Sequence, residues 1–244
     1  MVGNEHLGAH MRAKFVTVLF SIAALSALVS SPTTGQNMSN GFQPPFAPPT
    51  RPTEIQTPAA SHVERHDVDG KHMSTRVNDL VKATMAAAGQ QDWTTAKAKL
   101  AEARAVSNPT AFDTFEIEMV AAFVAVNTAD HVAALASYKK VIDNPFFAQT
   151  QTAAQQSSTL KNAMILANET SDYTSAIAFG AKLAAMGPVD DATEIALAFA
   201  YYGNKDYAMA KSLAQKSIDA AMAAGTKPND VATEIVAKSS ANMH

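Results

Sequence analysis

The 244-residue chain contains no cysteine, and this absence excludes several classes of function. Disulfide frameworks, thiolate metal sites, cysteine nucleophiles and a lipid-modified N-terminal cysteine all require that residue. Neither sign of charge dominates, because the net charge is −3 and the basic residues are scattered. A nucleic-acid-binding surface needs a basic patch or stripe, so the composition argues against that class. Aromatic residues make up only 7% of the chain, so each ring is expected to fill a defined place in the packing.

The longest apolar run lies near the N-terminus and is too short for a permanent membrane span. Arg12 and Lys14 precede an apolar core of about 15 residues, from Phe15 to Val29, and small and polar residues follow. A spanning helix needs about 20 apolar residues, whereas this order of charge, apolar core and small residues is typical of a secretory signal. We expect residues 1–35 to be a signal peptide, with Met11 as an alternative start. The mature protein is then periplasmic or secreted; the other interpretation is an N-terminal anchor.

Residues 36–72 are expected to be a disordered linker. Proline dominates the stretch 43–52, and because proline lacks the amide hydrogen, this stretch cannot be helix or central strand. The end of the linker contains side chains that can ligate a divalent metal: His62, His66, Asp67, Asp69 and His72. A disordered segment would first have to become ordered, so we predict no metal site and no cofactor. A metal-dependent enzyme that uses this segment is kept as an alternative.

The third segment, residues 73–240, has the periodicity of helices throughout. Val77, Leu80 and Val81 follow the i, i+3, i+4 spacing of one helix face, and strand-forming residues are sparse. The expected helices are 74–89 and 92–107, 112–126 and 130–142, 152–168 and 172–186, 191–202 and 206–224, with a short last helix at 230–238. The sequence therefore predicts an all-α domain of about four helix pairs.

One short pattern recurs at the start of the second helix of each pair. It consists of an aspartate, a ring residue, two further residues and an alanine: Asp92-Trp93 to Ala96, Asp130-His131 to Ala134, Asp172-Tyr173 to Ala176, and Asp206-Tyr207 to Ala210. The alanines advance in steps of 38, 42 and 34 residues, and such a period indicates a stacked helical array. Each aspartate is expected to cap its helix. Trp93 is expected to be buried between the first two pairs, and His131 to be a packing residue.

The pairs resemble the tetratricopeptide repeat over about residues 73–225. The best match is 191–218, with Ala198, Tyr201, Gly203, Ala210 and Ala214 at the positions where that family has its small and large residues. The chain is also similar to exported proteobacterial tetratricopeptide proteins of unassigned function, in the stretch 111–117. This resemblance implies a right-handed superhelical array of antiparallel helix pairs that binds a protein or peptide.

In that family the first helices of the pairs line a concave groove. The corresponding apolar and aromatic positions form the predicted binding groove: Met85, Met119, Phe123, Ile165, Ile195, Phe199 and Tyr202. Methionine adapts its shape and suits varied apolar partners. Lys161 is the only cation at the groove positions, so a clamp for a peptide carboxylate is not expected. Alternatively, these side chains pack against the linker or the terminal helix.

No catalytic constellation accompanies these helices, since no serine lies in a nucleophile-elbow pattern and no glycine loop suits phosphate. We therefore expect a non-catalytic adaptor or scaffold of the cell envelope that binds a protein or peptide. It is expected to have no nucleic-acid partner and no membrane span after signal cleavage. A structural subunit of an envelope assembly is the main alternative. The sequence leaves the partner and the oligomeric state open.

Overall fold

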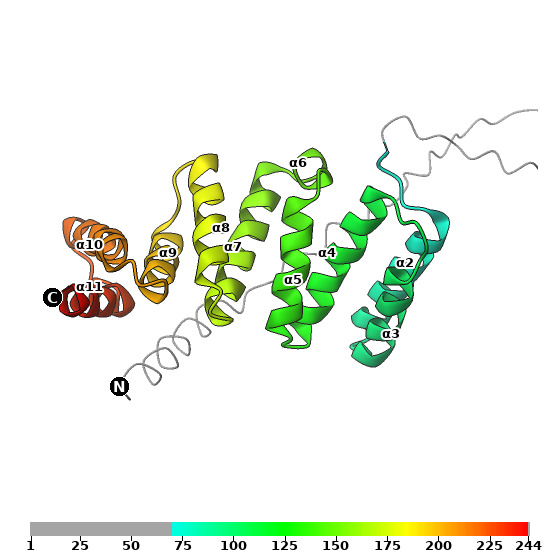
Figure 1. Cartoon of the computed structure of the whole chain (residues 1–244), viewed down its shortest axis with the longest axis horizontal. Coiled ribbons are helices and arrows are strands. Elements are labelled where there is room, and N and C mark those ends of the chain that lie inside the picture. The colour runs from blue at the N-terminus through cyan, green and yellow to red at the C-terminus, as the bar shows by residue number, and fades with distance from the viewer. Residues whose placement is uncertain (1–69, 244) are drawn as a thin grey trace, which may run out of the picture. The chain divides into compact units, whose positions relative to one another are not determined.

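The computed structural model describes residues 70–243, and every regular element in that range is a helix, as expected for the all-α class. The helices, labelled as in Figure 1, are α2 (Thr75–Gly89), α3 (Trp93–Arg104), α4 (Ala111–Asn127), α5 (His131–Asp143), α6 (Phe146–Thr150), α7 (Ala153–Glu169), α8 (Tyr173–Met186), α9 (Asp191–Gly203), α10 (Tyr207–Ala223) and α11 (Asp230–Asn242). The predicted signal peptide and the linker up to residue 69 lie outside the described residues.

Side-chain caps explain where most of these helices begin. Thr110 and Thr152 each form a reciprocal capping box with the residue three positions later, which starts α4 and α7. The cap of α9 is Asp190, whose carboxylate accepts the amide hydrogen of Thr193. An unexpected short helix, α6, follows Pro145, because proline is compatible with the start of a helical turn as well as with its end.

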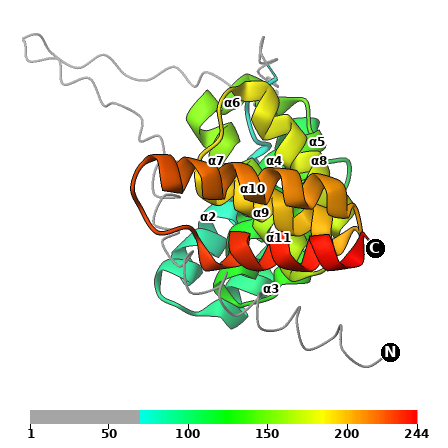
Figure 2. The same cartoon turned by 90° about the vertical axis from the view of Figure 1, so that its left-hand side faces the viewer.

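Four helix hairpins follow one another in chain order, and each joins neighbouring helices through a short turn. The hairpins are α2–α3, α4–α5, α7–α8 and α9–α10. Between hairpins, α2 and α3 pack on α4, α5 packs on α7, and α8 packs on α9. The last helix, α11, lies beside α10 and also contacts α9, as Figure 2 shows from the C-terminal end.

Small residues bring the helices of each hairpin close together. The four alanines of the recurring pattern, Ala96, Ala134, Ala176 and Ala210, are each 0% exposed. Larger side chains fill the spaces between hairpins, including Phe115, Tyr138 and Phe179 in the central part of the core. No helix within residues 70–243 has the length and apolar character needed to cross a membrane.

Candidate binding surface

The same turn closes all four hairpins and fixes the register of their helices. The residue before each pattern aspartate has a positive φ, between 54° and 65°, at Gln91, Ala129, Ser171 and Lys205. The amide of each aspartate donates to a carbonyl five residues earlier, at 2.8–3.0 Å, which is the Schellman arrangement. Each aspartate then caps the next helix by accepting an amide hydrogen three residues on, at 3.0–3.2 Å. One structural unit therefore ends the first helix and starts the second.

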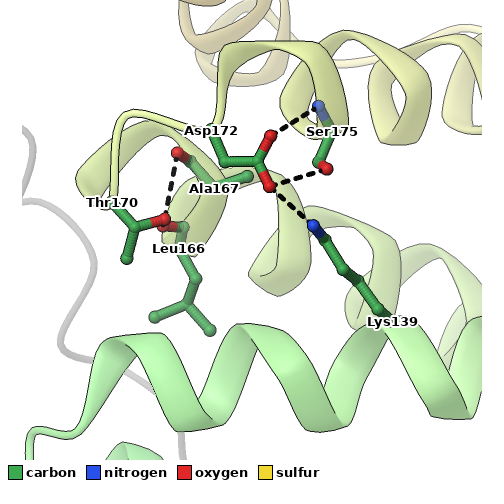
Figure 3. A network of polar contacts seen from close by, with 6 residues as sticks. All are labelled: Lys139, Leu166, Ala167, Thr170, Asp172 and Ser175. Atoms are coloured by element: carbon green, nitrogen blue, oxygen red, sulfur yellow. Dashed lines mark hydrogen bonds and ion pairs between the residues drawn. The ribbon is translucent and has the colours of Figure 1, made fainter.

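Figure 3 shows this turn in the third hairpin. Thr170 donates its hydroxyl to the carbonyl of Leu166, at 2.8 Å, while the Asp172 carboxylate accepts from the amide and hydroxyl of Ser175. Lys139 of α5 also reaches Asp172, at 2.6 Å, and so ties the preceding hairpin to the turn. Partial burial opposes the negative charge, but the hydrogen bonds from Lys139 and Ser175 outweigh it and keep the pKa of Asp172 below its usual value.

The ring residue of the pattern contacts the first helix of the next hairpin. Trp93 lies 6.4 Å from Phe123, and Tyr173 lies 6.1 Å from Phe199 in an edge-to-face arrangement, both measured between ring centroids. Trp93 is half-buried, so the expectation of a fully buried tryptophan was wrong in degree. Trp93 is the first residue of α3. These contacts position Phe123 and Phe199 relative to the preceding hairpins.

The second hairpin differs, because its ring residue makes a polar contact. His131 Nδ1 lies 2.8 Å from Glu169 Oε2 of α7. Glu169 is the third residue before Asp172, and the corresponding residue of the fourth hairpin is Gly203. Burial raises the pKa of Glu169, and the charge of His131 works in the opposite direction. His131 therefore joins two hairpins through a polar contact, whereas Trp93 and Tyr173 do so through aromatic packing.

The predicted groove residues divide into two groups. Four are half-buried and retain part of their surface: Met85, Phe123, Ile165 and Tyr202. Met85, Phe123 and Ile165 each stand seven residues before the pattern aspartate of their hairpin, so they are equivalent in register. The shared turn therefore places one apolar side chain from each of the first three hairpins at the same position.

The other three predicted residues belong to the interior. Met119, Ile195 and Phe199 are only 3–5% exposed. Met119 packs within the central core, while Ile195 and Phe199 form one cluster with Ile235 of α11 and its neighbours. The terminal helix thus packs on Ile195 and Phe199 of α9, which was one of the alternatives for the groove residues. These three residues cannot serve as an exposed binding wall, and the candidate surface reduces to Met85, Phe123 and Ile165, with Tyr202 at its edge.

Charged groups flank this reduced surface. Glu116 lies two helical turns before Phe123 on α4, and burial raises the pKa of its carboxyl group. Lys161 of α7 pairs with Asp190 at 2.7 Å. The hydrogen bonds from Lys161 and Thr193 lower the pKa of Asp190 to about 2. Lys161 is therefore engaged in an ion pair at the protein surface.

A buried carboxylate on the opposite side of α4 was not identified from the sequence. Glu118 has a side chain only 5% exposed, and it pairs with Arg104 at 2.6 Å and Lys140 at 2.9 Å. Burial alone would raise its pKa, but hydrogen bonds from Lys140, Arg104 and Ser137 outweigh this effect and hold the pKa below its usual value. Glu194 and Lys216 form the equivalent pair in the fourth hairpin. A glutamate and a lysine thus recur at the same two repeat positions, and this recurrence could have indicated the ion pair from the sequence.

Residues 70–243 contain no cluster of three or more histidine, cysteine or carboxylate side chains that could hold a metal ion. Four residues of the His-rich segment, His62, His66, Asp67 and Asp69, lie outside the described residues. Comparison with known proteins found no match to a family model, a curated protein or a solved structure.

Proposed function

We propose that this chain is a non-catalytic adaptor of the cell envelope that binds a protein or peptide on the face formed by its first helices. In this proposal the hairpins form a right-handed, tetratricopeptide-like array, and α11 closes its C-terminal end. The proposal of a periplasmic or secreted location rests on the charge, apolar core and small residues of positions 12–35.

The observation that carries the proposal is the equivalent register of Met85, Phe123 and Ile165. Residues at the same repeat position lie at equivalent places on successive hairpins. The position seven residues before the pattern aspartate is apolar and half-buried in the first three hairpins. Half-exposed apolar side chains on neighbouring helices are typical of surfaces that bind an amphipathic helix or extended peptide. The packing of α2 on α4 brings the first two of these positions onto adjacent helices.

The shared turns support a binding role because they make this surface rigid. Four Schellman turns with aspartate caps fix the ends of both helices in each hairpin, so the apolar positions keep their spacing without a partner. A preorganised surface loses less conformational entropy on binding than a flexible one. The half-buried state of Phe123 and Ile165 also leaves area that a partner can cover.

The test is quantitative capture of partners from the native envelope with the full chain and two double variants. Phe123→Ser with Ile165→Ser removes the candidate surface, whereas Val132→Ser with Met209→Ser removes two exposed apolar side chains, 70% and 43% exposed, from second helices. We expect the first variant to lose capture of a saturable partner by at least tenfold, since central interface residues contribute about 2 kcal/mol or more each. The control variant should capture normally.

Equal capture by both variants would place the binding surface elsewhere. Circular dichroism and thermal melting of each variant separate this outcome from unfolding, because a binding defect counts only for a variant that keeps its helicity.

A further inference from the structure

A cleft of about 500 Å³ lies between the second helices of the first two hairpins, away from the candidate surface on the first helices. α3 and α5 form its walls, and α4 forms its floor. The floor and walls are mainly apolar, with Leu100, Ala121, Val124, Ala125 and Ala133 among the lining residues. This volume falls within the range of about 300–1,000 Å³ that is usual for small-molecule sites.

Small side chains at repeat positions create the cleft. Ser137 occupies the position that Phe179 holds in the third hairpin and Leu213 in the fourth. Ala121 occupies the position of Leu197, whose side chain lies so close to Gly180 that an added Cβ would be 2.5 Å away. Where the fourth hairpin packs on the third, these two positions hold Leu213 and Leu197. Where the second hairpin packs on the first, they hold Ser137 and Ala121, and the smaller side chains leave the space open.

The α3 wall of the cleft carries the guanidinium of Arg104, which two buried side chains hold in place. Arg104 Nη2 lies 2.6 Å from Glu118 Oε2 and 3.0 Å from Ser137 Oγ, and both of these partners are buried. Within residues 70–243, the Nε and Nη1 donors of Arg104 have no hydrogen-bond partner, and the side chain is 42% exposed. Arg104 therefore lines the cleft with a positive group that is fixed through Nη2 and keeps two further donors for a ligand.

The charge of the cleft is positive overall. Lys140 shares Glu118 with Arg104, so two cations face one carboxylate. Lys97 lines the same cleft and has no carboxylate within ion-pair distance in the described residues, whereas Asp130 contributes one negative charge and caps the amide of Ala133. The charged residues that line the cleft are Lys97, Arg104 and Asp130, and the buried Glu118 is shared by Arg104 and Lys140 behind it, so the lining carries an excess of one positive charge, which favours an anion.

The remaining polar groups favour a ligand without amide groups of its own. Ser137 Oγ already accepts from Arg104, Thr128 donates its hydroxyl to the carbonyl of Val124, and one Asp130 oxygen is occupied by its cap. A peptide backbone in this cleft would lose water without finding enough partners, and each unpaired polar group is costly. An alkyl chain has no such requirement.

We propose that this cleft binds a medium-chain alkyl carboxylate, a function independent of the protein-binding surface on the first helices. The carboxylate contacts the free donors of Arg104, Lys97 increases the attraction, and the alkyl chain lies on Leu100, Ala121 and Val124. Lys97 and Arg104 are seven residues apart on α3, so the cleft extends about 10 Å along this helix, which suits an alkyl chain of medium length. At that distance Lys97 acts on the carboxylate by long-range attraction and not by contact.

The test is a titration of the full chain with octanoate. Calorimetry measures the affinity, and the amide NMR signals of Ala121, Val124 and Ala133 report the location. We expect saturable binding and shifts of these signals. Octanol and butanoate should each bind at least tenfold more weakly, because octanol lacks the charge and butanoate lacks four methylene groups.

Matched variants at repeat positions test the location without disturbing Glu118. Lys97→Gln should weaken octanoate binding about two- to fivefold, whereas Lys211→Gln, at the same position of the fourth hairpin, should not. Ala101→Leu fills the cleft and should abolish binding, while Ala181→Leu, its counterpart in α8, should leave binding unchanged.

Several results would overturn the proposal: no saturation by octanoate in the millimolar range, octanol binding as tightly as octanoate, or equal effects of Ala101→Leu and Ala181→Leu. Preferential binding of an acetylated tripeptide with a C-terminal leucine would also overturn it, because the ligand would then be a peptide. Thermal melting of each variant shows that it is folded before its binding is measured.

Discussion

Gly203 and Gly89 stand at the same repeat position, three residues before a pattern aspartate, but their surroundings differ. A Cβ added at Gly203 would lie 2.4 Å from Cζ of Tyr173 and within 2.6 Å of two further atoms of that ring. At Gly89 nothing lies within 4 Å, because no earlier hairpin supplies a ring residue in the described part of the chain. We therefore expect Gly203→Ala to destabilise the protein and Gly89→Ala not to.

The magnitude follows from the contact distances. Carbon atoms in contact are normally about 3.5–4.0 Å apart, so the Tyr173 ring must move by about 1 Å, against its packing on Phe199. Overpacking of this kind costs about 1–3 kcal/mol. Alanine gains at most about 1 kcal/mol over glycine in a helix, and less at a helix end. The net effect of Gly203→Ala is a loss of about 1–2 kcal/mol, whereas Gly89→Ala is neutral or slightly stabilising.

Urea unfolding, followed by circular dichroism, measures both variants. The double variant Tyr173→Leu with Gly203→Ala completes a mutant cycle, and its cost should be clearly smaller than the sum of the two single costs. Equal stability of Gly203→Ala and Gly89→Ala would refute the reasoning, because Tyr173 would then not lie against Gly203. That result would remove the proposed role of the ring residue in joining hairpins.

Three further predictions concern the turn, the half-buried Glu116 and processing. Ala129→Gly should stabilise the protein by about 0.5–1 kcal/mol in urea unfolding, because alanine is strained at a positive φ, whereas Ala136→Gly within α5 should cost about 1 kcal/mol. The pKa of Glu116 is raised in the folded state, so its ionisation opposes folding and stability is lost as pH rises through that pKa. Glu116→Gln should therefore be more stable than the original chain at pH 7, with the difference vanishing in acid; no difference at pH 7 would contradict this. Intact-mass analysis of exported protein should give an N-terminus between about residues 30 and 37, and retention of residues 15–29 would exclude cleavage.

The hairpins could be predicted from the sequence because local signals agree with one another. Asp92, Asp130, Asp172 and Asp206 mark the starts of second helices, and the alanines that follow mark their buried faces. The residues with positive φ in the turns could not be recognised from their type. Gln91, Ala129, Ser171 and Lys205 occupy the position where glycine is preferred. The hydrogen bonds of the turn and the aspartate caps hold these exposed residues there despite the strain.

The candidate surface could be predicted only in part, because the repeat register does not reveal what covers a side chain. Met85, Phe123 and Ile165 follow directly from the repeat. Ile195 and Phe199 have the same pattern, but α11 packs over them, and a terminal helix has no separate signal for that role. The cleft beside Arg104 depends on side-chain volumes from three helices, which no single stretch of sequence contains.

Site-specific photo-crosslinking of the full chain in its native envelope tests the central proposal most directly. A photo-reactive phenylalanine analogue replaces Ile165 on α7 or, as the control, Ala178, an exposed residue on α8. The proposed binding face predicts a discrete crosslinked partner from position 165 and none from position 178. Crosslinks from position 178 alone, or equal crosslinking from both positions, would contradict binding on the first helices.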